Sequence, residues 1–152
     1  MTIPVDLIKK LREETGAPVI RVKQVLDEVG GSEKKAFEIL QKEGFEKAAK
    51  RADRVTSQGV IASYVHHTKK IASLVELLCE TDFVARNEVF LATAQDFAMQ
   101  VASTNPKDEA ALLADEFIKD PSMKVEDLLK SAIAKTGENI RLGRFYRLEI
   151  GA

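Results

Sequence analysis

Two carboxylates, those of Glu80 and Asp82, come closest in this sequence to a catalytic pair. Paired carboxylates can perform acid–base chemistry when they converge on one substrate atom. On an extended segment, however, alternate residues share only a face, and neither a nucleophile nor a set of metal ligands stands nearby in the sequence. We therefore expect no catalytic pair at this position and no covalent chemistry.

Three further residues, His66, His67 and Cys79, are of types that can bind a metal ion. Adjacent histidines on a strand point to opposite faces, so only one of them could join Cys79, whereas a zinc site needs three or four ligands. We favour a core cysteine and solvated histidines in a hairpin. The sequence also lacks a glycine-rich phosphate loop, so we expect no metal and no cofactor.

Four basic residues, Lys47, Lys50, Arg51 and Arg54, are spaced so that they would share one face of a helix. The chain as a whole carries a net charge of -1, and no aromatic residues accompany the cations to stack on bases. We therefore expect no direct binding of nucleic acid. Two interpretations stay open, a solvated helix face and a face that binds an acidic protein partner.

The segment Thr81 to Asn87 must form a sharp bend, because it follows a hydrophobic strand and precedes a strongly helical pattern. Thr81 or Asp82 can satisfy the free backbone N–H groups of such a turn. Periodicity alone favours Phe83 as a hydrophobic staple that closes the bend onto the core.

The elements that position these residues begin with three helices, expected at about Val5–Glu14, Pro18–Val29 and Ser32–Gly44. Glycines follow each of them, which is typical of a small three-helix bundle. The basic segment Phe45–Arg54 comes next, and the hydrophobic period then changes from helical to strand-like. We place the boundary there, with one domain at 1–56 and a second at 57–152.

The second domain alternates strands and helices. We expect strands at Val60–His66, Ile71–Cys79 and Asn139–Ile150, and helices at Glu88–Ser103 and Val125–Lys135. The first two strands are joined by a short polar link, which predicts a hairpin. The stretch 106–124 shows no clear pattern. Together the elements predict an α+β fold with a small, mainly antiparallel sheet.

Two apolar patterns predict buried faces in this domain. In the long helix, whose expected cap is Asn87, the buried stripe comprises Phe90, Leu91, Ala94, Phe97, Ala98 and Val101. In the last strand, the residues expected to share one face are Ile140, Leu142, Tyr146, Leu148 and Ile150.

Composition restricts where the chain works. It has 152 residues with 45% hydrophobic and 31% charged side chains, an ordinary globular composition. A single cysteine indicates a reducing compartment. No apolar run approaches the ~20 residues that span a bilayer, and the first residues lack the pattern of a signal peptide. We expect a cytoplasmic protein without a membrane partner.

Several motifs, in the same order along the chain, resemble one known family. They are Cys79 to Asn87, which reads CETDFVARN; Leu11 to Ala17, LREETGA; Lys47 to Ala52, KAAKRA; and Gly137 to Ile140, GENI, followed by Arg144-Phe145. The chain resembles elongation factor Ts, the bacterial guanine-nucleotide exchange factor for the GTPase elongation factor Tu. The resemblance covers most of the chain and implies a ubiquitin-associated-like amino-terminal bundle followed by an α+β core.

The resemblance also implies roles for particular residues. In the family, the Asp-Phe pair of this motif enters elongation factor Tu and disturbs the region that holds Mg²⁺ and the phosphates. Asp82 and Phe83 would then form the wedge, with Thr81 and Val84 fixing its shape. The residues implied to contact the partner are Ile20, Lys23, Arg51 and Arg86. This resemblance reverses the preference for Phe83 as a core staple.

The chain departs from the family at two places. Members usually read Gly-Met-Met-Asp-Cys-Lys-Lys where this chain reads Pro18 to Gln24, PVIRVKQ, so that Arg21 reverses a charge. The region after Asn105-Pro106 is short, and a second core subdomain is missing. Compact forms resemble versions that pair two copies, which suggests a homodimer. Three functions stay open: an exchange factor, a binding module without exchange activity, and a nucleic-acid-binding adaptor.

Overall fold

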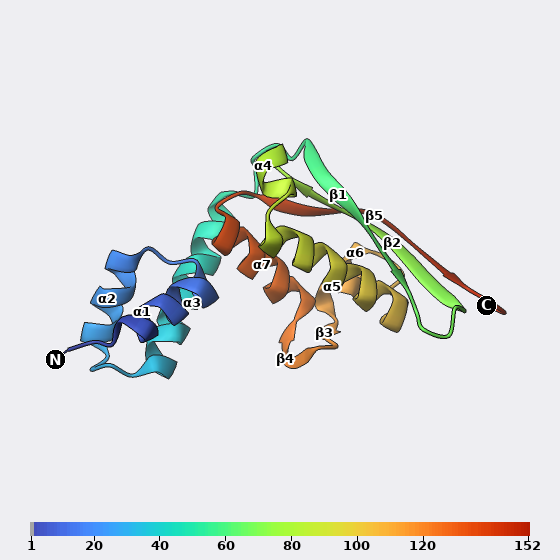
Figure 1. The fold of residues 1–152 in the computed structure, drawn as a ribbon. Coiled ribbons are helices and arrows are strands. Elements are labelled where there is room, and N and C mark those ends of the chain that lie inside the picture. The colour runs from blue at the N-terminus through green and yellow to red at the C-terminus, as the bar shows by residue number, and fades with distance from the viewer. Residues whose placement is uncertain (1) are drawn as a thin grey trace.

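The computed structural model describes residues 2–152, which form a helical bundle joined to an α+β core (Figure 1). Within this range the chain forms helices and a small antiparallel sheet, which confirms the expected α+β class. No helix of this range is both long and apolar enough to cross a membrane.

The amino-terminal bundle consists of α1 (Val5–Thr15), α2 (Val19–Glu28) and α3 (Glu33–Lys50). Each helix contributes apolar residues to one shared core, as the sequence pattern predicts. The fully buried members are Leu11, Val22, Val25, Leu26, Ala36 and Leu40. Gly16 ends α1 in the left-handed conformation, with φ 72°, where a residue with a side chain would be strained.

The prediction that the third helix ends at Gly44 is wrong, because α3 continues to Lys50. A glycine inside a helix costs about 1 kcal/mol relative to alanine. Packing explains its presence here. A Cβ on Gly44 would lie 3.2 Å from Ala134 Cβ, so glycine allows α3 to approach α7 (Val125–Thr136) closely.

The continuous helix also changes the basic stripe. Lys47 and Lys50 lie in α3, but Arg51 is its C-cap and Arg54 lies beyond it, so the four cations do not share one helical face. Arg51 donates from Nη1 to the carbonyl of Ile133 at 3.2 Å. Arg54 pairs with Glu80, the residue after β2 (Ile71–Cys79), at 3.5 Å. Arg51 and Arg54 therefore help to attach the end of α3 to the core rather than forming a free basic surface.

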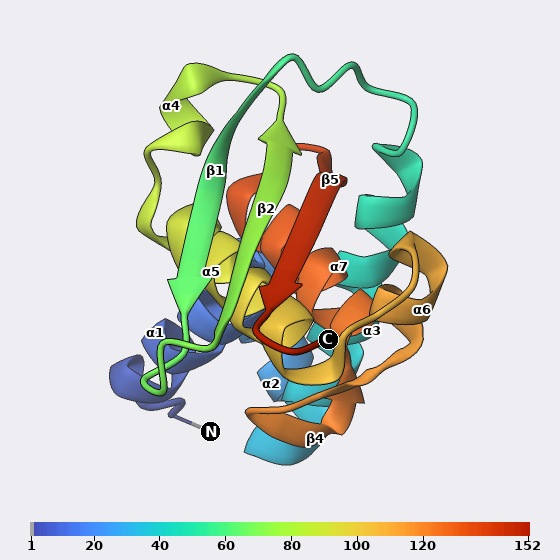
Figure 2. The same cartoon turned by 90° about the vertical axis from the view of Figure 1, so that its right-hand side faces the viewer.

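The core contains a three-stranded antiparallel sheet in the order β1 (Gln58–Val65), β2 (Ile71–Cys79) and β5 (Ile140–Glu149). Two helices, α5 (Glu88–Thr104) and α7, lie against one face of this sheet (Figure 2). The buried residues between these layers include Val75, Leu77, Cys79, Phe90, Phe97 and Val101. The predicted cap of α5 is confirmed, since the Asn87 side chain accepts the N–H of Val89 at 2.8 Å.

Two predictions about buried faces are wrong. Leu91 is exposed, because it lies on the solvent side of α5. The last strand does not keep its five apolar residues on one face, because it contains a β-bulge: Val75 pairs with Phe145 but Leu77 pairs with Leu142. Two residues, Gly143 and Arg144, thus stand opposite the single residue Glu76. Such an extra residue moves all following side chains to the other face.

The bulge produces an exposed apolar surface on the sheet. Before it, Ile140 and Leu142 point into the core, whereas after it Tyr146, Leu148 and Ile150 point outward. The face of the sheet opposite α5 and α7 lies open in Figure 2. The exposed apolar residues of this open sheet face are Ile61, Val65, Leu74, Tyr146, Leu148 and Ile150.

The stretch 106–124, which shows no clear sequence pattern, folds into short elements. They are α6 (Glu109–Ala114), β3 (Glu116–Phe117) and β4 (Asp120–Lys124), the last two forming a small antiparallel hairpin. The fully buried side chain of Gln100 fixes this hairpin: it donates to the carbonyl of Glu116 and accepts the N–H of Ile118, both at 3.0 Å.

Candidate functional site

A single helical turn, α4 (Asp82–Ala85), occupies the bend between β2 and α5. Thr81 is its N-cap, and the Thr81 hydroxyl accepts the N–H of Val84 at 3.3 Å. Val84 and Ala85 are buried in the core of the α+β domain. So short a helix is not stable by itself, so its conformation depends on this cap and on the burial of its second half.

The first half of the turn projects into solvent. Phe83 is 77% exposed, so the staple interpretation, in which its ring packs onto the core, is wrong. Asp82 pairs with Arg86 across one turn, with 3.2 Å between Arg86 Nη2 and Asp82 Oδ2. Both side chains of this pair are also largely exposed, and such surface pairs contribute little to stability. The turn therefore presents one bare aromatic ring beside an ion pair.

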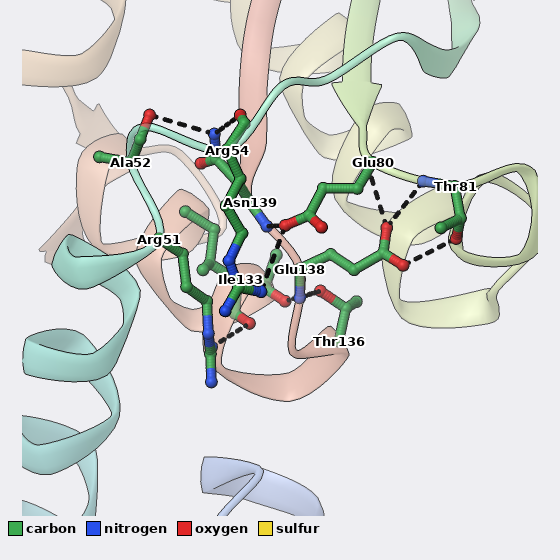
Figure 3. A network of polar contacts seen from close by, with 10 residues as sticks. Arg51, Ala52, Arg54, Glu80, Thr81, Ile133, Thr136, Glu138 and Asn139 are labelled. Atoms are coloured by element: carbon green, nitrogen blue, oxygen red, sulfur yellow. Dashed lines mark hydrogen bonds and ion pairs between the residues drawn. The ribbon is translucent and has the colours of Figure 1, made fainter.

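Glu138 holds the start of this turn from a different part of the chain (Figure 3). It follows Gly137, the left-handed C-cap of α7. One carboxylate oxygen accepts the backbone N–H groups of Glu80 at 3.1 Å and Thr81 at 3.0 Å. The other oxygen accepts the Thr81 hydroxyl at 2.7 Å. Three hydrogen bonds to one carboxylate thus define where β2 ends and α4 begins.

The neighbouring residue Asn139 connects the same region to the end of α3. Its buried side chain donates from Nδ2 to the carbonyls of Arg54 at 2.9 Å and Ala52 at 3.3 Å. Its backbone N–H is donated to the carboxylate of Glu80 at 2.7 Å, and that carboxylate also pairs with Arg54 at 3.5 Å. The end of α3, the turn before α4 and the turn after α7 therefore form one polar joint (Figure 3).

The two carboxylates considered for acid–base chemistry do not converge. Glu80 is directed into the polar joint, where it binds Asn139 and Arg54, whereas Asp82 pairs with Arg86 on the surface. Each carboxylate therefore has its own cationic partner and its own surroundings. This arrangement brings no pair of acids to one substrate position.

The residues considered as metal ligands do not form one cluster, because the two histidines lie far along β2 from Cys79. The imidazole rings of His66 and His67 stand 4.1 Å apart at the β1–β2 hairpin, whereas Cys79 is fully buried at the other end of β2. Burial raises the pKa of the Cys79 thiol, and the nearby Glu138 carboxylate raises it further. Among residues 2–152, no group of three His, Cys, Asp or Glu side chains is placed to hold a metal ion.

The four residues implied to contact a partner lie on three separate parts of the fold. Ile20 and Lys23 are exposed on α2, and Arg86 is exposed just after α4. Arg51 is only half-buried, but its guanidinium is bound to the carbonyl of Ile133. Ile20, Lys23 and Arg86 are exposed, Arg86 in its surface pair with Asp82, while Arg51 lies at the joint between the bundle and α7.

The charge reversal at Arg21 has an internal explanation. Arg21 donates three hydrogen bonds to Glu43 of α3, one at 2.5 Å from Nη2 and two at 3.0 and 3.2 Å from Nε, and also approaches Glu28 at 3.4 Å. The hydrogen bonds from Arg21 lower the pKa of the Glu43 carboxyl below its usual value. The arginine therefore connects two helices of the bundle instead of projecting as a free charge.

Comparisons with known proteins first give the class. A family model described as elongation factor TS, a translation elongation factor, matches residues 80–152, which include α4, Glu138 and the last strand. Curated proteins named elongation factor Ts are similar over the whole chain. The relative from Nitratidesulfovibrio vulgaris is 39% identical, and the alignment covers 100% of this chain and 98% of the relative. The relatives from Oleidesulfovibrio alaskensis and Thermotoga petrophila are 38% and 40% identical, each with 99% and 98% of the two chains covered.

The chain therefore belongs to the elongation factor Ts family. It is a compact member. The alignment with the Nitratidesulfovibrio protein extends over 197 positions, whereas this chain has 152 residues, so at least 45 positions (197 − 152) have no counterpart here.

The residue that sequence reasoning missed is Glu138. Its motif, Gly137 to Ile140, contributes to the family resemblance, but nothing in that pattern assigns the side chain a function. The available signal was weak: an acidic residue directly after a helix C-cap glycine. Its contact with Thr81 joins residues 57 positions apart, which no local pattern reveals.

Proposed function

We propose that this chain is a guanine-nucleotide exchange factor for elongation factor Tu. It binds the GDP-bound GTPase in the cytoplasm, and its α4 turn disturbs the site that holds Mg²⁺ and the phosphates. GDP then leaves, and incoming GTP displaces the exchange factor. The chain itself performs no covalent chemistry in this scheme and requires no cofactor.

The observation that carries the proposal is the exposure of Phe83 on an anchored turn. An exposed aromatic ring contributes no free energy of burial to the isolated protein. Aromatic residues are, however, frequent at the centres of protein interfaces, where such a ring becomes buried. The backbone beneath the ring is fixed by Thr81, Val84 and Ala85. Little conformational entropy is then lost when the ring enters a partner.

Thermodynamic coupling explains how such a wedge releases nucleotide. If binding of the exchange factor weakens GDP, then GDP weakens the exchange factor by the same factor. Mg²⁺ neutralises the phosphate charge, so a change at the Mg²⁺ site lowers nucleotide affinity without contact to the base. In this proposal Phe83 supplies the bulk, and Asp82 supplies a charge beside it. The ion pair between Asp82 and Arg86 is exposed and can open at little cost.

The grip on the partner is assigned to the bundle. Ile20 is exposed in the first turn of α2, and Lys23 follows it by three residues on the same helix, so the two are neighbours on its surface. We propose them as contacts with the GTPase. Arg51 belongs to this proposal in a different sense, since its contact with Ile133 fixes the bundle against α7. Arg86 completes the set beside the wedge.

Release of a fluorescent GDP analogue from elongation factor Tu, with and without this protein, tests the proposal. We expect acceleration that rises with protein concentration and then saturates. Binding to elongation factor Tu with unchanged release would contradict exchange activity and leave a binding module. Binding to RNA whose affinity falls steeply with salt would instead indicate a nucleic-acid adaptor.

We also propose that two copies of the chain pair through the open sheet face. Contiguous exposed apolar residues of this kind mark interaction surfaces. The chain lacks at least 45 positions that the Nitratidesulfovibrio relative possesses, so it has less material of its own with which to cover the sheet. The patch combines Tyr146 and aliphatic side chains, and an apolar surface of this composition matches a copy of itself. The mass of the protein in solution tests this pairing.

A further inference from the structure

Glu138 follows α7 and lies outside the α4 turn that carries the proposed wedge. Even so, its carboxylate binds the two residues directly before α4. Its carboxylate accepts the N–H groups of Glu80 and Thr81 and the hydroxyl of Thr81. These groups stand directly before Asp82 and Phe83. We infer that Glu138 is a positioning residue for nucleotide exchange, which holds the α4 turn in the orientation that presents Phe83 to the partner. This inference rests on the proposed function.

The backbone of Glu138 is itself fixed, as positioning requires. Gly137 caps α7 through its N–H to the carbonyl of Ile133 at 2.9 Å. The Thr136 hydroxyl accepts the N–H of Glu138 at 3.4 Å, and the next residue, Asn139, is only 2% exposed. Glu138 therefore reaches α4 from the capped end of α7, between the Gly137 cap and the buried Asn139.

The wedge needs such a support because α4 has only four residues. On one side the turn is anchored by the buried side chains of Val84 and Ala85, but Thr81, Asp82 and Phe83 on the other side are exposed. Without Glu138, the two N–H groups before the turn would bind water, and the ring of Phe83 would sample more orientations. Insertion would then have to order the turn first.

The same joint connects the wedge to the bundle. Asn139 binds the carbonyls of Ala52 and Arg54 beyond the end of α3, and its N–H binds Glu80. Residues 138 and 139 thus bind both the turn before α4 and the segment that follows α3 (Figure 3). The orientation of Phe83 relative to α3 is set by this pair of residues.

The test measures release of the fluorescent GDP analogue over a range of exchange-factor concentrations, which separates the maximal rate from the half-saturating concentration. For Glu138→Ala we expect the maximal rate to fall about tenfold, while the half-saturating concentration changes less than about twofold. Glu138→Gln keeps the shape and one acceptor, so it should restore part of the rate. The control is Glu126→Ala, which removes an exposed acid at the other end of α7, where it pairs with Lys130.

A double-mutant cycle shows whether Glu138 acts through Phe83. In a Phe83→Ala background, Glu138→Ala should change the maximal rate by less than about twofold, because the ring that it positions is gone. Amide hydrogen exchange at Glu80 and Thr81 should be faster in Glu138→Ala, and this readout does not depend on exchange activity.

The outcomes separate the inference from the proposed function. A wild-type protein that binds elongation factor Tu without accelerating release contradicts the proposed function. A wild-type protein that is active while Glu138→Ala keeps the full maximal rate overturns only the inference. The inference is also overturned if the double variant loses maximal rate by the product of the two single-variant losses. If Glu138→Ala fails to fold, the same measurements are made with Glu138→Gln. A maximal rate equal to that of wild type for this variant, with no coupling to Phe83→Ala, overturns the inference.

Discussion

Phe83 and Val84 are neighbours in the chain, yet Phe83 is 77% exposed whereas Val84 is only 5% exposed. Both belong to the single turn of α4, which directs the side chain of Phe83 into solvent and that of Val84 into the core. Burial of Val84 anchors the backbone, so the exposed ring is held by the fold rather than by contacts of its own. This relationship is the structural basis of the wedge that we propose for this member of the elongation factor Ts family.

The contact between the bundle and the core gives a prediction about stability. Gly16 has φ 72°, and a Cβ there would lie 2.7 Å from the carbonyl oxygen of Ala134 in α7. Gly16→Ala should therefore lower the free energy of unfolding by about 2–4 kcal/mol, as backbone strain and overpacking add. Urea unfolding followed by circular dichroism measures this change.

The matched control for that variant is Gly30→Ala. Gly30 has φ 66°, but nothing lies within 4 Å of the position of its Cβ. Gly30→Ala should lower the free energy of unfolding by only about 1 kcal/mol, because backbone strain acts there without overpacking. Equal losses for the two variants would contradict the close contact between Gly16 and α7.

The pair of Arg21 and Glu43 predicts a dependence on pH. Because hydrogen bonds from Arg21 hold the pKa of Glu43 below its usual 4.5, the folded state favours the ionised carboxylate. This contribution is fully present above pH 4.5 and is lost as the pH falls through the folded pKa. The melting temperature of wild type should therefore exceed that of Glu43→Gln at pH 7, and the difference should shrink below pH 4.5. A difference that stays constant from pH 7 to acid would contradict this account.

The open sheet face gives a prediction about assembly. We expect the wild-type protein to sediment with about twice the 16.8 kDa mass of one chain. Leu148→Glu places a charge within the apolar patch and should produce monomers, whereas Val5→Glu, at an exposed apolar residue of the bundle, should not. A monomeric wild type at high micromolar concentration would contradict this pairing.

Most elements could be predicted from the sequence, because local signals define them. Asn87 caps α5, Gly137 ends α7, and the alternating side chains of Ile71–Cys79 match its buried and exposed faces. Where prediction failed, tertiary contacts decided the structure. Gly44 reads as a helix end, but packing against Ala134 keeps it inside α3.

The last strand shows the same limit more strongly. Its alternation predicts one buried face, but the bulge opposite Glu76 directs Tyr146 and Leu148 outward. Gly143, inside the strand, is a local signal of the bulge, because a glycine within a strand often marks one. The alternation alone does not show how β2 and β5 pair, so it predicts the wrong face for the residues after the bulge.

The candidate site was predictable in part. The family resemblance implies Asp82 and Phe83 as the wedge, which stays a prediction. Periodicity alone favoured the wrong position for the Phe83 ring, because one apolar residue near a helix start commonly packs inward. The contribution of Glu138 to the turn could not be inferred, since it depends on the meeting of β2 with the end of α7.

The maximal rate of GDP release with Phe83→Ala tests the central claim most directly. The wild-type protein should accelerate release from elongation factor Tu, and Phe83→Ala should reduce the saturated rate by about 10²-fold while the protein remains folded and still binds the GTPase. Val5→Ala, which removes an equally exposed apolar side chain of the bundle, should keep the saturated rate within about twofold of wild type. A Phe83→Ala protein that releases GDP as fast as wild type would contradict the claim that this ring is the wedge.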